Sequence, residues 1–123
     1  MNSRILIIDD AENMREMLRL TLDFEGYETE LACNGLEGLK AARKGGFNLI
    51  LCDIEMPEMD GLQFVQNFRK EFGQDTPIVM LTAEDNNATL DRSLEAGATS
   101  VLIKPFEPTN MLEEVRVRIA AEA

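Results

Sequence analysis

Short apolar runs alternate with helical patterns five times along this 123-residue chain. The clearest run, Leu49 to Cys52, leads directly into Asp53 and then into a loop that contains Pro57 and Gly61. A continuous apolar run of this length, bounded by turn residues, is typical of a strand that is buried on both faces. The other runs are residues 4–8, 27–33, 78–81 and 101–103, of which 27–33 alternates weakly, as at a sheet edge.

The segments between these runs have the apolar spacing of amphipathic helices. The first ends at Gly26, and further helices are expected over residues 36–44, 62–72, 85–96 and 108–121. The helix at 85–96 has only two large apolar residues, Leu90 and Leu94, so little of it need be buried. Five strand–helix units predict an α/β fold with a doubly wound parallel sheet of five strands and helices on both faces. We expect residues 1–123 to form one such domain.

The net charge of −11 narrows the range of partners. Contact with nucleic acid needs a basic surface that releases counterions from phosphates, and an anionic membrane would repel this chain. We find no secretory signal or membrane-spanning run, and two cysteines, Cys33 and Cys52, do not make a disulfide scaffold. We therefore expect a cytoplasmic protein that binds neither nucleic acid nor membrane directly. The chain has no histidine, which excludes acid–base catalysis and metal ligation by that residue.

Four of the five predicted strands end in residues that can bind a phosphoryl group or a divalent cation. These residues are Asp9 and Asp10, Asp53, Thr82, and Lys104. Because the carboxyl ends of parallel strands lie at one rim of the sheet, where ligands bind in such folds, we expect these side chains to lie close together. Independent solvated charges would not select strand ends so consistently.

The three aspartates need a compensating charge. Two carboxylates about 4 Å apart repel by about 4 kcal/mol at an effective dielectric constant of about 20, and one lysine cannot offset three of them. Mg²⁺ prefers oxygen ligands of this kind. Asp53, at the end of the central strand, is then the candidate nucleophile toward a phosphoryl group. Thr82 can donate a hydrogen bond to a phosphoryl oxygen, and Lys104 adds a positive charge there.

The chain resembles, from end to end, a response-regulator receiver domain of the single-domain chemotaxis type. The motifs that carry the resemblance are Asp9-Asp10, Asp53 with Met56-Pro57 and Asp60-Gly61, Thr82-Ala83, Gly97-Ala98, and Lys104-Pro105-Phe106. The resemblance implies a flavodoxin-like fold with strand order 2-1-3-4-5. It also implies a two-component or phosphorelay function, in which Asp53 takes a phosphoryl group from a phosphohistidine of a histidine kinase or phosphotransfer protein.

The same resemblance implies the details of the site. Asp10, Asp53 and the backbone carbonyl of Glu55 would bind Mg²⁺, with Asp9 assisting through water, and the Lys104–Pro105 bond would be cis. The chain would not be an enzyme beyond its own phosphorylation and autodephosphorylation. It would signal to a downstream protein through the helix at 85–96, the strand at 101–103 and the helix at 108–121, with no DNA-binding output domain of its own.

Three positions depart from the usual family pattern or add to it. Val101 stands where these domains usually have Tyr or Phe, so the expected switch pair is Thr82 with Val101 rather than with an aromatic ring. Glu55, two residues after Asp53, and Glu84, two residues after Thr82, each add a carboxylate beside the site. Such a carboxylate could be an ordinary solvated charge, or it could compete with or position the water that hydrolyses an acyl phosphate.

Three other functions remain open at the level of sequence. A Mg²⁺-dependent phosphatase of the haloacid-dehalogenase kind also uses an Asp nucleophile, but there the nucleophile is on the first strand and the acidic pair comes last. An FMN-binding electron carrier of similar topology would need a phosphate loop after the first strand, where this chain has Asp9-Asp10-Ala11-Glu12. The third is a receiver-like module that binds partners without being phosphorylated.

Overall fold

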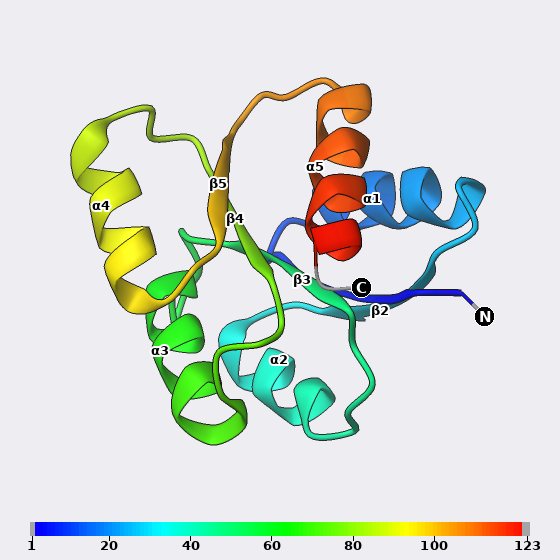
Figure 1. Cartoon of the computed structure of the whole chain (residues 1–123). Coiled ribbons are helices and arrows are strands. Elements are labelled where there is room, and N and C mark those ends of the chain that lie inside the picture. The colour runs from blue at the N-terminus through cyan, green and yellow to red at the C-terminus, as the bar shows by residue number, and fades with distance from the viewer. Residues whose placement is uncertain (1, 122–123) are drawn as a thin grey trace.

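The computed structural model describes residues 2–121, and over this range strands and helices alternate strictly (Figure 1). The strands are β1 (Arg4–Ile8), β2 (Glu28–Ala32), β3 (Leu49–Asp53), β4 (Ile78–Thr82) and β5 (Ser100–Ile103). The helices are α1 (Glu12–Phe24), α2 (Gly35–Ala42), α3 (Gly61–Phe72), α4 (Asn87–Ala96) and α5 (Pro108–Ala121). Met1 and the last two residues of the predicted domain lie outside the described range. No helix between residues 2 and 121 is long and apolar enough to cross a membrane.

All four strand pairings are parallel, and the sheet has the order β2-β1-β3-β4-β5. This confirms the predicted flavodoxin-like fold, including the edge position of β2. The register aligns Ile8 with Cys52, Asp53 with Leu81, and Thr82 with Ile103. The carboxyl ends of β1, β3, β4 and β5 therefore lie at one rim.

The strands alternate their side chains between two apolar layers, because successive residues of a strand point to opposite faces. In β1, Leu6 and Ile8 pack on the side of α2 and α3, whereas Ile5 and Ile7 pack on the side of α1 and α5. Figure 1 shows α1 and α5 together on one side of the sheet and α2 and α3 on the other. Both faces of β1 and β3 are consequently covered by apolar side chains. The polar residues at the carboxyl ends of these strands lie at the rim of the sheet.

The loop between β3 and α3 is fixed by local chemistry. Asp60 caps α3, since its side chain accepts from the Gln63 N–H while the Gln63 side chain accepts from the Asp60 N–H, a reciprocal capping box. A Cβ at Gly61 would lie 2.2 Å from the Asp53 carbonyl oxygen, so only glycine fits there. Glu58 adopts a φ of 67°, which is unusual for a non-glycine residue. The loop closes against the end of β3, where the Gly61 N–H donates to the Ile54 carbonyl at 2.8 Å.

In two helices, burial does not simply follow hydropathy. In α3, Phe72 is 40% exposed although it is large and apolar, whereas Phe64 is fully buried. In α4 the apolar pair Leu90 and Leu94 is 39% and 46% exposed, and the buried residues are instead Thr89 and Ser93.

The polar face of α4 can be buried because its hydroxyl groups are satisfied nearby. Ser93 donates to the Thr89 carbonyl at 2.8 Å, and Thr89 donates to the Glu84 carboxylate at 3.1 Å.

The two cysteines are free thiols, but only Cys52 is a core residue, since Cys33 is half-buried.

Candidate functional site

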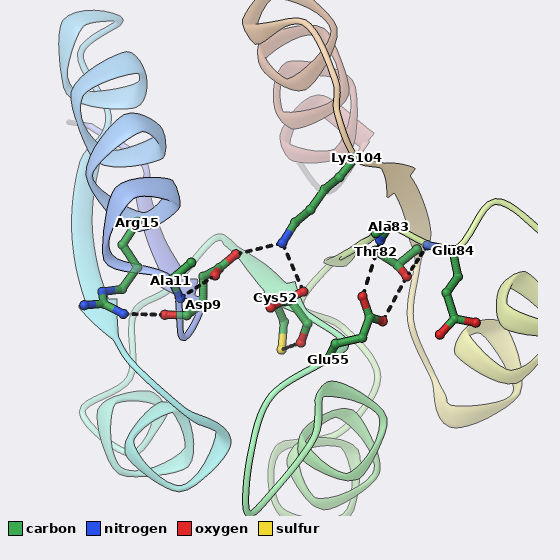
Figure 2. A network of polar contacts seen from close by, with 10 residues as sticks. Asp9, Ala11, Arg15, Cys52, Glu55, Thr82, Ala83, Glu84 and Lys104 are labelled. Carbon is green, nitrogen blue, oxygen red and sulfur yellow. Dashed lines mark hydrogen bonds and ion pairs between the residues drawn. The ribbon is translucent and has the colours of Figure 1, made fainter.

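The rim at the carboxyl ends of the strands brings the predicted residues together, and Figure 2 labels Asp9, Thr82 and Lys104 there. Asp9 and Asp10 follow β1, Asp53 and Thr82 are the last residues of β3 and β4, and Lys104 follows β5. A carboxylate oxygen from each of the three aspartates lies within 4.8 Å of those of the other two. The parallel register alone produces this convergence, because it aligns the ends of the central strands.

Asp9 is the most constrained of the three carboxylates. It is fully buried, and its Oδ1 atom accepts a hydrogen bond from the Ala11 N–H at 2.9 Å. Its Oδ2 atom is 3.3 Å from the Lys104 ammonium group, and its backbone carbonyl accepts from the Arg15 guanidinium at 2.7 Å. Asp10, in contrast, is exposed to solvent. The acidic pair thus combines one carboxylate whose hydrogen bonds are made within the protein with one that faces the solvent.

Lys104 is shared between two carboxylates. Its Nζ atom lies 3.2 Å from Asp53 Oδ1 and 3.3 Å from Asp9 Oδ2, and the lysine side chain is 19% exposed. Burial alone would lower the pKa of Lys104, but the charges of Asp9 and Asp53 outweigh it and raise that pKa above its ordinary value. The ammonium group is therefore held in its charged form at the centre of the site.

Asp53 has the opposite electrostatic balance. Burial and the neighbouring charge of Asp9 raise the pKa of Asp53 from 3.8 to about 7, although Lys104 acts to lower it. Near neutral pH, the positive charge of Lys104 therefore does not fully stabilise the ionised form of Asp53. The cluster offers only hard oxygen ligands, which suit Mg²⁺, and a divalent cation would supply the missing charge.

Thr82 makes a contact that the sequence did not predict. Its buried hydroxyl donates to Glu55 Oε2 at 2.9 Å, and the adjacent Ala83 N–H donates to Glu55 Oε1 at 3.3 Å. The Thr82 Oγ1 atom also accepts from the Glu84 N–H at 3.0 Å. Figure 2 shows the Glu55 side chain reaching from the loop after β3 toward the end of β4. The Glu55 carboxylate therefore bridges two donors at the edge of the acidic cluster.

Arg15 is a residue beside the site that the sequence analysis did not single out. Its contact is with the backbone of Asp9, for which the amino-acid pattern carries no signal.

Val101, the predicted switch residue, is half-buried and packs against the apolar layer on the side of α2 and α3. The Lys104–Pro105 peptide bond is cis, as expected.

These features agree with the family comparison. The family model for the response regulator receiver domain matches residues 5–116. The chain belongs to this family, and it is a receiver domain of the two-component response regulators.

Two transcriptional regulatory proteins are among the relatives of this chain. The transcriptional regulatory protein PcoR of Escherichia coli is 42% identical over 113 residues, which are 92% of this chain and 50% of PcoR. The uncharacterized transcriptional regulatory protein YkoG of Bacillus subtilis is 38% identical over 115 residues, or 94% of this chain and 50% of YkoG. This chain thus spans about half the length of these curated relatives.

The solved structures include receiver domains that match over nearly their whole length. Chemotaxis protein CheY4 of Vibrio cholerae has a TM-score of 0.91 at 36% identity, with coverage of 95% of this chain and 98% of that chain. A CheY-like receiver domain protein from Methanospirillum hungatei has a TM-score of 0.93 at 32% identity, with coverage of 99% and 97%.

Proposed function

We propose that Asp53 accepts a phosphoryl group from a phosphohistidine of a histidine kinase or phosphotransfer protein. The observation that carries this proposal is the setting of the Asp53 carboxylate. Its side chain is 5% exposed, lies 3.2 Å from the Lys104 ammonium group and adjoins the oxygens of Asp9 and Asp10. A single rim position thus combines a nucleophilic oxygen, a fixed positive charge and a cluster of oxygen ligands.

Mg²⁺ is the cofactor that fits this donor set. We expect Asp10, Asp53 and the backbone carbonyl of Glu55 to hold the ion, and Asp9 to contribute through a water molecule. When bound, the ion would offset the repulsion among the three carboxylates and polarise a phosphoryl oxygen. Both carboxylate oxygens of Asp9 already accept hydrogen bonds, from the Ala11 N–H and from Lys104, which fits an indirect role better than direct ligation.

The transfer step assigns a distinct part to each residue. A carboxylate oxygen of Asp53 attacks phosphorus, the P–O bond forms as the P–N bond of the phosphohistidine breaks, and the electron pair returns to the imidazole nitrogen. Lys104 stabilises the negative charge that the phosphoryl group brings. The Thr82 hydroxyl and the Ala83 N–H donate to phosphoryl oxygens. Hydrolysis of the acyl phosphate restores Asp53, so the chain would act only on its own phosphoryl group.

The signal would leave the site through the face made by α4, β5 and α5, with Thr82 and Val101 as the switch residues. Leu90 and Leu94 of α4 and Val117 of α5 are exposed apolar side chains, which a downstream protein could cover. Val101 is β-branched and stiff, so it can fill space beside Thr82 but cannot turn a ring inward. We therefore expect weaker coupling than in domains with an aromatic residue at this position.

The chain's own partners are expected to be proteins. A net charge of −11 opposes direct contact with nucleic acid. The named relatives are transcriptional regulatory proteins about twice as long as the matched region, so DNA contact in such proteins would come from their other half. We propose that residues 1–123 act as one receiver domain, in the cytoplasm, whatever output it controls.

Incubation with acetyl phosphate and Mg²⁺, followed by intact-mass measurement, tests the proposal. We expect addition of one phosphoryl group to the wild type and none to Asp53→Asn or to wild type treated with a chelator. Asp75→Asn removes an exposed carboxylate just before β4, at the opposite end of the sheet, and should be modified like the wild type. Undiminished modification of Asp53→Asn would assign the nucleophile elsewhere.

A further inference from the structure

The Glu55 carboxylate already occupies the donors that the proposed function reserves for phosphoryl oxygens. One of its oxygens accepts from the Thr82 hydroxyl at 2.9 Å and the other from the Ala83 N–H at 3.3 Å. Thr82 is fully buried, whereas Glu55 is exposed. The arrangement is that of an anion held by two donors at the end of β4 (Figure 2).

These donors cannot serve two anions at once. A hydroxyl group has one hydrogen and a backbone amide has one. The Thr82 oxygen also accepts from the Glu84 N–H at 3.0 Å, which fixes the side of the hydroxyl from which its hydrogen can point. A phosphoryl group on Asp53 could therefore engage Thr82 and Ala83 only after Glu55 had released them.

We infer that Glu55 is a built-in anionic occupant of the phosphoryl subsite, and that phosphoryl acceptance at Asp53 exchanges one anion for another at Thr82 and Ala83. This inference rests on the proposed function. The exchange is sterically simple, because the exposed Glu55 side chain can turn into solvent. The Glu55 carboxylate therefore weakens the binding of a phosphoryl group, because it must first be displaced. Before that group arrives, the same carboxylate keeps the Thr82 hydroxyl and the Ala83 N–H oriented as donors.

The inference makes Glu55 a positioning residue with two separable effects. In the free protein it orients Thr82 and Ala83, and in the modified protein it must be displaced. Removal of its carboxylate should loosen the Ala83 amide and, independently, favour a phosphoryl mimic. A carboxylate that merely lay near the site would do neither.

The first measurement uses the metal-free protein and needs no phosphorylation. In amide NMR spectra, Glu55→Ala should shift the Ala83 resonance and speed its hydrogen exchange. Glu84→Gln is the matched control, since it removes one negative charge from the adjoining loop while the Glu55 contacts stay in place. Hydrogen exchange is the deciding readout, because Glu84 adjoins Ala83 in the sequence and its replacement shifts the Ala83 resonance by itself. An Ala83 amide whose exchange speeds equally in both variants would overturn the inference.

The second measurement titrates each protein with fluoroberyllate, a phosphoryl mimic, at saturating Mg²⁺. We expect Glu55→Ala to bind it about tenfold more tightly than wild type, the factor that a net hydrogen-bond contribution of about 1.4 kcal/mol corresponds to. Glu55→Gln keeps an acceptor but loses the charge, and should fall between the two. Glu84→Gln should change the affinity much less than Glu55→Ala.

Two other outcomes distinguish a failure of the anion exchange from a failure of the proposed function. Equal or weaker binding by Glu55→Ala would overturn the anion exchange and leave the proposed function intact. Failure of the wild type and all variants to bind fluoroberyllate would overturn the proposed function itself and this inference with it.

Discussion

Replacement of Asp53 by asparagine should stabilise the metal-free protein, although it removes a salt bridge. The pKa of the Asp53 carboxyl group rises from 3.8 to about 7, first because it is buried and second because it adjoins Asp9. Since each pKa unit corresponds to about 1.4 kcal/mol, keeping Asp53 ionised in the folded state costs about 4 kcal/mol. Asparagine has nearly the same shape without the charge. The substitution therefore relieves most of this cost.

The effect should depend on pH with a definite sign. Because the pKa of Asp53 is higher in the folded state, folding is favoured while the group is protonated in both states, below about pH 4. That contribution is lost progressively as the pH rises to about 7, and it is then constant. The free energy of unfolding gained by Asp53→Asn should accordingly be below about 2 kcal/mol at pH 5 and about 4 kcal/mol at pH 8.

Urea denaturation in the presence of a chelator measures this difference directly. The two proteins should have the same dependence of unfolding free energy on urea and different midpoints. Asp75→Asn is the control, because that exposed carboxylate lies away from the rim. A gain that stayed the same from pH 5 to pH 8, or a net loss of stability at pH 8, would refute the electrostatic reasoning.

Three further predictions follow from the same site. Asp10→Asn should weaken Mg²⁺ binding at least tenfold by calorimetry while raising the melting temperature of the metal-free protein; unchanged affinity would contradict its assignment as a ligand. Lys104→Met should lower the unfolding free energy of the metal-free protein by about 3 kcal/mol at pH 8 and by less at pH 5, because it leaves two buried carboxylates without their cation; equal losses at both values in urea denaturation would contradict this. Fluoroberyllate with Mg²⁺ should change amide exchange in α4 and β5 as well as in the loop after β3, and changes confined to that loop would exclude the proposed output face.

The sequence predicted the layout of the site because the topology leaves little freedom. A parallel sheet with buried central strands must place the residues after β1, β3 and β5 at one rim. Asp9, Asp53 and Lys104 are therefore neighbours whatever the details of packing. The 3.2 Å contact between Lys104 and Asp53 also requires the Lys104 side chain to reach past β4, which lies between β3 and β5 in the sheet.

The contact between Glu55 and Thr82 could not be predicted in the same way. It depends on the path of the loop after β3, where Glu58 has a positive φ and Gly61 packs against the Asp53 carbonyl. Neither feature determines by itself where the side chain of Glu55 points. The sequence identified Glu55 as an extra carboxylate beside the site but left its partner open.

The residues that α4 buries could not be predicted for a related reason. Leu90 and Leu94 are the only large apolar residues that the sequence offers in this helix, yet both are exposed. Thr89 and Ser93 lie inward because their hydroxyl groups find acceptors in Glu84 and in the helix backbone. Hydropathy patterns assign polar residues to the solvent and cannot register such local hydrogen bonds.

The most direct test of the central claim is to locate the phosphoryl group chemically. Borohydride reduces an acyl phosphate of aspartate to homoserine, which peptide mass spectrometry identifies by position. After incubation with acetyl phosphate and Mg²⁺, we predict homoserine at position 53 and unchanged aspartate at positions 9 and 10. Homoserine at position 9 or 10, or none anywhere under conditions that add a phosphoryl group, would contradict the assignment of Asp53 as the acceptor.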